Sequence, residues 1–144
     1  MSGWNLENPV FSSYVFWSGV LAAKMLLMGP ITGYFRITRK AFANPEDVAA
    51  MGGKDVKTNS DVERVRRAHQ NDLENIPVFW VCGLLYVLTN PSLLTASILF
   101  RIYASARILH TVFYLRGSFL RGFSYFAGMV VKFFMVGTVL YTFW

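Results

Sequence analysis

The sequence predicts an all-α integral membrane protein, a four-helix bundle in a single domain that covers residues 1–144. Hydrophobic residues make up 54% of the chain, against roughly 45 to 50% in a typical soluble domain. Four mainly apolar stretches, at about 9–37, 61–90, 92–115 and 119–144, are each long enough for a helix that crosses a hydrocarbon core about 30 Å thick. A lipid bilayer is therefore the expected surrounding of this chain.

The first predicted helix, about 9–37, carries Lys24 near its centre. A charge at that depth costs roughly 2.5 to 3.5 kcal/mol on membrane-insertion scales, so we expect Lys24 to pair with a neighbouring helix. The chain ahead of the helix has Glu7 and no basic residue, which is unlike a cleaved signal peptide. Residues 38–60 are expected to form a polar loop, with a short helical turn after Pro45 and a flexible linker at Gly52-Gly53.

The second predicted helix, about 61–90, begins with charged turns and ends in an apolar segment. The apolar part, residues 76–88, spans only about 20 Å, so the last charged turns must lie at membrane depth. Arg67, Gln70, Asn71 and Glu74 follow at i, i+3, i+4 and i+7, which places them on one helical face. This face is a candidate polar site.

The third predicted helix, about 92–115, contains Arg101, Arg107 and His110. Its two arginines cost roughly 5 to 7 kcal/mol at the membrane centre, about as much as its apolar side chains return, so these charges need partners inside a bundle. Tyr114 shares a face with Arg107 and His110. The fourth predicted helix, about 119–144, begins near Arg121 and has Tyr125 one turn later.

Basic residues are concentrated in the segments after the first and third predicted helices: Arg36, Arg39, Lys40, Lys54, Lys57, Arg64, Arg66, Arg67, Arg116 and Arg121. The positive-inside rule places these segments in the cytosol, and the polar site then opens to the cytosolic side. Because the cations sit at the ends of membrane helices, we expect no nucleic-acid partner. A metal site is not expected from a single cysteine and two histidines.

Two hypotheses account for the charges at membrane depth. Arg67, Glu74, Arg107 and Arg121 leave an excess of positive charge, which suits a small flexible ligand that is mostly anionic and carries one amine for Glu74. Alternatively, the same groups form an internal salt-bridge network that holds the helices together. Spacing alone leaves both open.

Three separated blocks carry a family resemblance: Lys40 to Asp47; Val62-Glu63-Arg64 with Arg67-Ala68-His69 and Asn71 to Asn75; and Ala106-Arg107 with His110-Thr111 and Tyr114-Leu115. The chain resembles the membrane-associated proteins in eicosanoid and glutathione metabolism (MAPEG) over almost its whole length. The resemblance implies a homotrimer in the endoplasmic reticulum membrane, with glutathione bound at each subunit interface near the cytosolic side.

The residues that match the family's glutathione site are Arg36, Arg67, Gln70, Asn71, Glu74, Arg107, His110, Tyr114, Arg121 and Tyr125. In that reading Glu74 takes the ligand's α-amine, supported by Arg67 and Arg107, while His110 and arginines take its carboxylates. Arg121 is the expected catalytic residue beside the sulfur, with help from Tyr125. A cationic neighbour favours the thiolate, which is the nucleophilic form.

Three positions differ from the family's prostaglandin E synthases: Gln70 replaces an arginine, Gly122 a serine and Phe126 a threonine, whereas Tyr125 matches them. The expected activity is therefore a glutathione transferase that conjugates hydrophobic electrophiles and also reduces lipid hydroperoxides. One alternative is isomerisation of prostaglandin H to prostaglandin E, supported by Asp47 and Tyr125. A second is a non-catalytic regulator that presents lipids, as one member of the family does.

Overall fold

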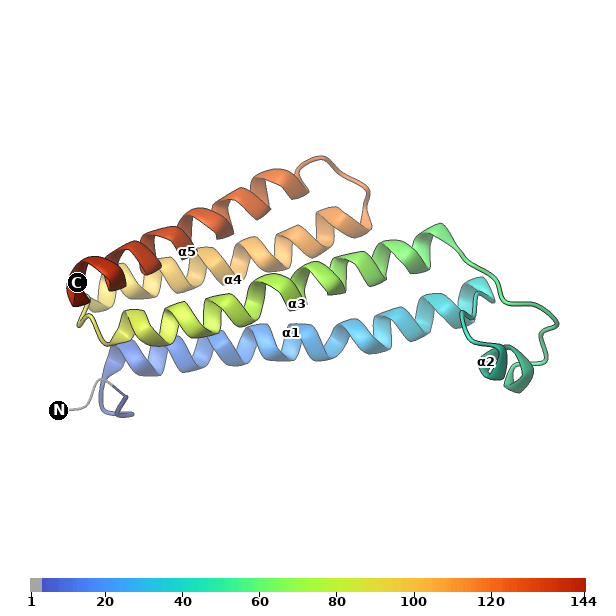
Figure 1. Cartoon of the computed structure of the whole chain (residues 1–144), viewed down its shortest axis with the longest axis horizontal. Helices are drawn as coiled ribbons and strands as arrows, with labels where there is room; N and C mark the ends of the chain where they lie inside the picture. The colour runs from blue at the N-terminus through green and yellow to red at the C-terminus, as the bar shows by residue number, and fades with distance from the viewer. Residues whose placement is uncertain (1–3) are drawn as a thin grey trace.

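The computed structural model describes residues 4–144 and contains five helices in that range. They are α1 (Pro9–Arg39), α2 (Pro45–Ala50), α3 (Ser60–Val87), α4 (Leu93–Leu115) and α5 (Arg121–Phe143), shown in Figure 1. The ends of the four long helices differ from the expected ranges by a turn or less. The short helical turn expected after Pro45 is the six-residue helix α2, which brings the number of helices in the described residues to five.

Local sequence fixes where the long helices begin. The side chains of Asn8, Asn59 and Ser92 accept hydrogen bonds from backbone N–H groups in the first turns of α1, α3 and α4, groups that have no partner within the helix. α1 ends at Arg39, and the next residue, Lys40, has a left-handed φ of 49°. The amide of the following residue, Ala41, bonds back to the carbonyl of Arg36 at 3.0 Å.

The loop between α1 and α3 is more ordered than the sequence predicted. α2 follows Asn44-Pro45, and the amide of Gly53 donates to the carbonyl of Val48 at 2.9 Å. The amide of Lys57 donates to the carbonyl of Phe42 at 3.1 Å, which ties the far part of the loop to its start. These two hydrogen bonds give the backbone around Gly52-Gly53 a defined path.

The four long helices form one elongated bundle (Figure 1), in which α3 and α4 contact each other and both contact α1 and α5. Three helices, α1, α4 and α5, are long and apolar enough to cross a membrane. α3 has a similar length, but its first half carries the charged motif. The start of α1 and the C-terminus lie at the end of the bundle opposite α2.

Aromatic side chains form the core toward the end of the bundle where α1 begins and α5 ends. The rings of Phe79 and Tyr103 stack with centroids 4.1 Å apart, and Phe100 meets Phe79 edge-on at 6.0 Å. Tyr14 of α1 packs on Phe100 at 5.8 Å, and its hydroxyl donates to the carbonyl of Trp80 at 2.8 Å. These contacts hold α1, α3 and α4 in a fixed register and so position the polar groups nearer the α2 end.

Gly83 provides a test of this packing. A Cβ atom on Gly83 would lie 2.9 Å from Cε2 of Tyr14, so Gly83→Ala must displace a ring that is also held by a hydrogen bond. We expect a loss of about 1 to 3 kcal/mol in the free energy of unfolding, measured by unfolding in mixed detergent micelles. Gly19→Ala is the matched control, because a Cβ there has nothing within 4 Å; equal losses for the two variants would contradict the packing.

Candidate functional site

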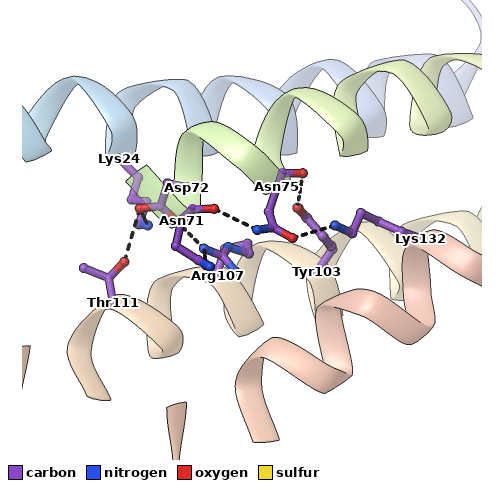
Figure 2. Close-up of polar contacts among 8 residues, drawn as sticks. All are labelled: Lys24, Asn71, Asp72, Asn75, Tyr103, Arg107, Thr111 and Lys132. Atoms are coloured by element: carbon purple, nitrogen blue, oxygen red, sulfur yellow. Dashed lines mark hydrogen bonds and ion pairs between the residues drawn. The ribbon is translucent and has the colours of Figure 1, made fainter. Parts of the chain in front are cut away.

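Asp72 of α3 is the centre of a buried polar network (Figure 2). Its side chain is 0% exposed. It forms an ion pair with Lys24 of α1 and a second one with Arg107 of α4 at 2.6 Å, and it accepts a hydrogen bond from Thr111 at 3.4 Å. The prediction that Lys24 pairs with a neighbouring helix is confirmed. One carboxylate thereby links three helices.

The network continues toward α5 through Asn75. Lys132 of α5 donates to Oδ1 of Asn75 at 2.7 Å, and the Asn75 amide donates to the carbonyl of Asn71 at 2.8 Å. The Tyr103 hydroxyl donates to the carbonyl of Asn75 at 2.8 Å. Two cationic side chains, Lys24 and Arg107, thus share one carboxylate, and the third, Lys132, is bound by an amide oxygen.

A pocket of about 560 Å³ lies between α1 and α3, toward the α2 end. Its polar lining includes Arg36 of α1 and Arg66, Arg67, His69 and Gln70 of α3. Gln70 also donates to Oε1 of Glu74 at 3.2 Å, which places that carboxylate beside the pocket. The structure therefore brings together four of the predicted site residues: Arg36, Arg67, Gln70 and Glu74.

A second group of predicted residues meets where α4 ends and α5 begins. The guanidinium carbon of Arg121 lies 4.8 Å from the centre of the Tyr114 ring, a cation–π contact. The His110 ring lies 5.5 Å from Tyr114 and 6.2 Å from Tyr125. Arg121 is the first residue of α5, so the positive end of that helix dipole adds to its charge.

The remaining predicted residues, Asn71 and Arg107, belong to the buried network. Arg107 donates to Oδ1 of Asn71 at 2.7 Å as well as to Asp72. The expectation that Arg107 supports Glu74 is therefore corrected, since its carboxylate partner is Asp72. The residues predicted to share one face of α3 also point to two places. Asn71 turns toward α4, whereas Arg67 and Gln70 line the pocket between α1 and α3.

Comparison with known proteins decides the family. The sequence model of the MAPEG family matches residues 14–141. The chain belongs to the MAPEG family. It is 48% identical over 115 residues to microsomal glutathione S-transferase 1 of Mus musculus, which covers 76% of this chain and 74% of that protein. The corresponding protein of Homo sapiens is 46% identical over 115 residues, which again cover 76% of this chain and 74% of that protein. Prostaglandin E synthase of Homo sapiens is 38% identical over 111 residues, 76% of this chain and 73% of that protein.

Membership of the MAPEG family and the three apolar helices identify an integral membrane protein. In this MAPEG chain the residue that sequence reasoning missed is Asp72. Helical spacing left Asp72 out of the candidate face, because the residue after Asn71 on a helix points about 100° away from Asn71. Charge accounting could have found it, since Lys24, Arg107 and Lys132 all need an anion at membrane depth and few of the eight acidic residues lie there.

Proposed function

We propose that this protein is a glutathione transferase of the endoplasmic reticulum membrane, built as one membrane domain. It conjugates glutathione to hydrophobic electrophiles, and it reduces lipid hydroperoxides. The observation that carries the proposal is the arginine-lined pocket between α1 and α3, in a chain 46 to 48% identical to proteins named microsomal glutathione S-transferase 1. Two thirds or more of each chain is covered by that similarity.

The residues at the pocket suit the charges of glutathione. Glutathione carries two carboxylates, one ammonium group and two amides on a flexible chain. Arg36 and Arg67 offer guanidinium donors for the carboxylates, and Glu74 beside Gln70 offers an acceptor for the ammonium group. Arg66 also lines the pocket but is paired with Glu63 at 2.8 Å. The volume of about 560 Å³ lies within the range usual for small-molecule sites.

Unpaired buried polar atoms support the same assignment. Nε of Arg36 and Nδ1 of His110 are buried and have no hydrogen-bond partner among residues 4–144, as is also true of Ser18 Oγ, Trp80 Nε1 and Arg107 Nε. Buried polar atoms nearly always have a partner in proteins, so both atoms are suited to a polar ligand. Both residues belong to the set predicted from the sequence.

In the proposed mechanism Arg121 activates the thiol. Its guanidinium, held against the Tyr114 ring and placed at the start of α5, stabilises the glutathione thiolate, and Tyr125 assists by hydrogen bonding to the sulfur. For conjugation, the sulfur forms a bond to the electrophilic carbon, the leaving group departs with the bonding electrons, and the thiol proton goes to water. For a hydroperoxide, two glutathione thiols give the disulfide while the peroxide becomes an alcohol and water.

The proposed assembly is a homotrimer with glutathione at the subunit interfaces. Within residues 4–144, no side-chain hydrogen bond or ion pair joins the α1–α3 pocket to the group formed by His110, Tyr114, Arg121 and Tyr125. A second subunit that places its α4–α5 group over the pocket would complete the site. The α2 end, which carries most of the loop cations, would then face the cytosol, and hydrophobic substrates would enter from the bilayer.

Arg67→Met tests the pocket. Arg67 is exposed and lines it, so its loss should remove a charged hydrogen bond to a glutathione carboxylate, worth about 1.5 to 3 kcal/mol. We expect the Kd for glutathione to rise roughly 10- to 100-fold by isothermal titration calorimetry. Arg116→Gln, an exposed arginine at the end of α4, should leave the Kd unchanged. An unchanged Kd for Arg67→Met would remove this residue from the site.

A direct assay decides between the activities. Purified protein with glutathione is expected to turn over chlorodinitrobenzene and a fatty-acid hydroperoxide. Turnover of prostaglandin endoperoxide without conjugation would favour the isomerase instead. Asp47 supports that alternative, because it lines a mostly apolar pocket together with Arg36. Failure to bind millimolar glutathione would favour the non-catalytic lipid-presenting regulator.

A further inference from the structure

Arg101 differs from the other cations deep in the spanning helices. Lys24 and Arg107 pair with Asp72, and Lys132 is bound by Asn75. Arg101 lies eight residues after Leu93, the first residue of α4, about 12 Å into the helix. Its side chain is exposed, and throughout the described part of the chain it makes no ion pair or side-chain hydrogen bond.

Arg101 stands in a groove between two spanning helices. The groove has a volume of about 440 Å³ and runs along α4 and α5. Its walls are mostly apolar, with Ile102 and Leu109 from α4 and Phe123 from α5, and Ser105 adds a hydroxyl one turn from Arg101. A guanidinium exposed to hydrocarbon is costly unless it meets an anion. The groove thus combines one cationic position with a long apolar surface.

A second copy of this chain has no suitable carboxylate to offer. Of the eight acidic residues, Asp72 is buried and paired, and five lie at the α2 end: Glu46, Asp47, Asp55, Asp61 and Glu63. Glu7 precedes α1, outside the span. Glu74 lies 13 residues before Val87, about 20 Å from the end at which α4 begins, so it is about 8 Å deeper than Arg101, whose side chain leans toward that end. The anionic headgroups of the bilayer are the better-placed partners.

We infer that this groove binds a single anionic phospholipid of the leaflet opposite the α2 end, with its phosphate on Arg101 and an acyl chain along α4 and α5. Helical side chains lean toward the N-terminus of their helix, so the guanidinium of Arg101 reaches back toward the lipid headgroups at the start of α4. The guanidinium matches a phosphate with two parallel hydrogen bonds. This inference does not depend on the proposed glutathione chemistry.

Native mass spectrometry of the purified protein tests the lipid site, with phosphatidylglycerol added to the detergent micelles. We expect one tightly retained phosphatidylglycerol per chain, an apparent affinity at least roughly tenfold lower for Arg101→Gln, and an unchanged affinity for Arg116→Gln. Ser105→Leu keeps the charge but narrows the groove, and it should also weaken retention. Circular dichroism verifies that each variant is folded.

Three results would overturn the inference. Equal retention by wild type and Arg101→Gln would show that the phosphate does not use this arginine. Retention of oleate but not of phosphatidylglycerol would assign the groove to free fatty acids. If the wild type retains no lipid and the oligomer dissociates in the Arg101→Gln variant, the arginine belongs to a subunit contact.

Discussion

Arg121→Ala is expected to lower the rate of glutathione conjugation at neutral pH by about 100- to 1,000-fold, the effect typical of removing one preorganised charge-stabilising donor. Arg121 is exposed at the first turn of α5 and is oriented by the Tyr114 ring. Because the arginines that would hold the carboxylates lie elsewhere, in the α1–α3 pocket, glutathione should still bind. The expected signature is loss of the near-ultraviolet thiolate band with little change in Kd.

Two companion variants sharpen this result. Arg121→Lys keeps the charge but loses the planar stacking on Tyr114, so we expect it to recover part of the thiolate band. Arg116→Gln removes a nearby exposed cation outside the proposed site, and the band should remain. If Arg121→Ala leaves the band intact, Arg121 does not stabilise the thiolate.

Asp72→Asn is expected to reduce the free energy of unfolding by about 3 to 5 kcal/mol, because it leaves Lys24 and Arg107 buried without their carboxylate. Asparagine has nearly the same shape, so little of the loss would come from packing. Equilibrium unfolding in mixed micelles of SDS and mild detergent would measure it. The double variant Lys24→Met with Asp72→Asn should recover part of the loss, since one unpaired cation is removed.

The surface pair Arg39–Asp61 is the control for Asp72. Its atoms are 2.9 Å apart, but the two side chains are 50% and 40% exposed. Asp61→Asn should therefore cost no more than about 1 kcal/mol. A comparable cost for Asp61→Asn and Asp72→Asn would mean that the buried network does not hold the bundle together.

The fold could be predicted from sequence to the extent that it depends on local signals. Apolar length located the four long helices, and the structure adds that Asn8, Asn59 and Ser92 cap the starts of three of them. α2 is only six residues long, too short for periodicity to separate it from a turn. The ordering of the loop after it depends on backbone hydrogen bonds to Val48 and Phe42, which carry no sequence signal.

The candidate site was predicted as a set of residues but not as an arrangement. Spacing along α4 correctly placed His110 near Tyr114. Spacing along α3 could not show that Asn71 turns to Arg107 while Arg67 faces α1, because that depends on where the neighbouring helices pack. The sequence leaves open whether Arg67, Glu74, Arg107 and Arg121 hold a ligand or form a salt-bridge network. Of these four, only Arg107 is ion-paired in the described part of the chain, and its partner is Asp72.

Titration of glutathione with the wild-type protein, followed by the near-ultraviolet thiolate band, tests the proposed function most directly. A free cysteine thiol has a pKa of about 8.5 and is mostly protonated at pH 7. The proposed site predicts a saturable thiolate band at neutral pH, with a midpoint that matches the Kd for glutathione from calorimetry. Binding of glutathione without any thiolate band would contradict activation of the thiol by Arg121.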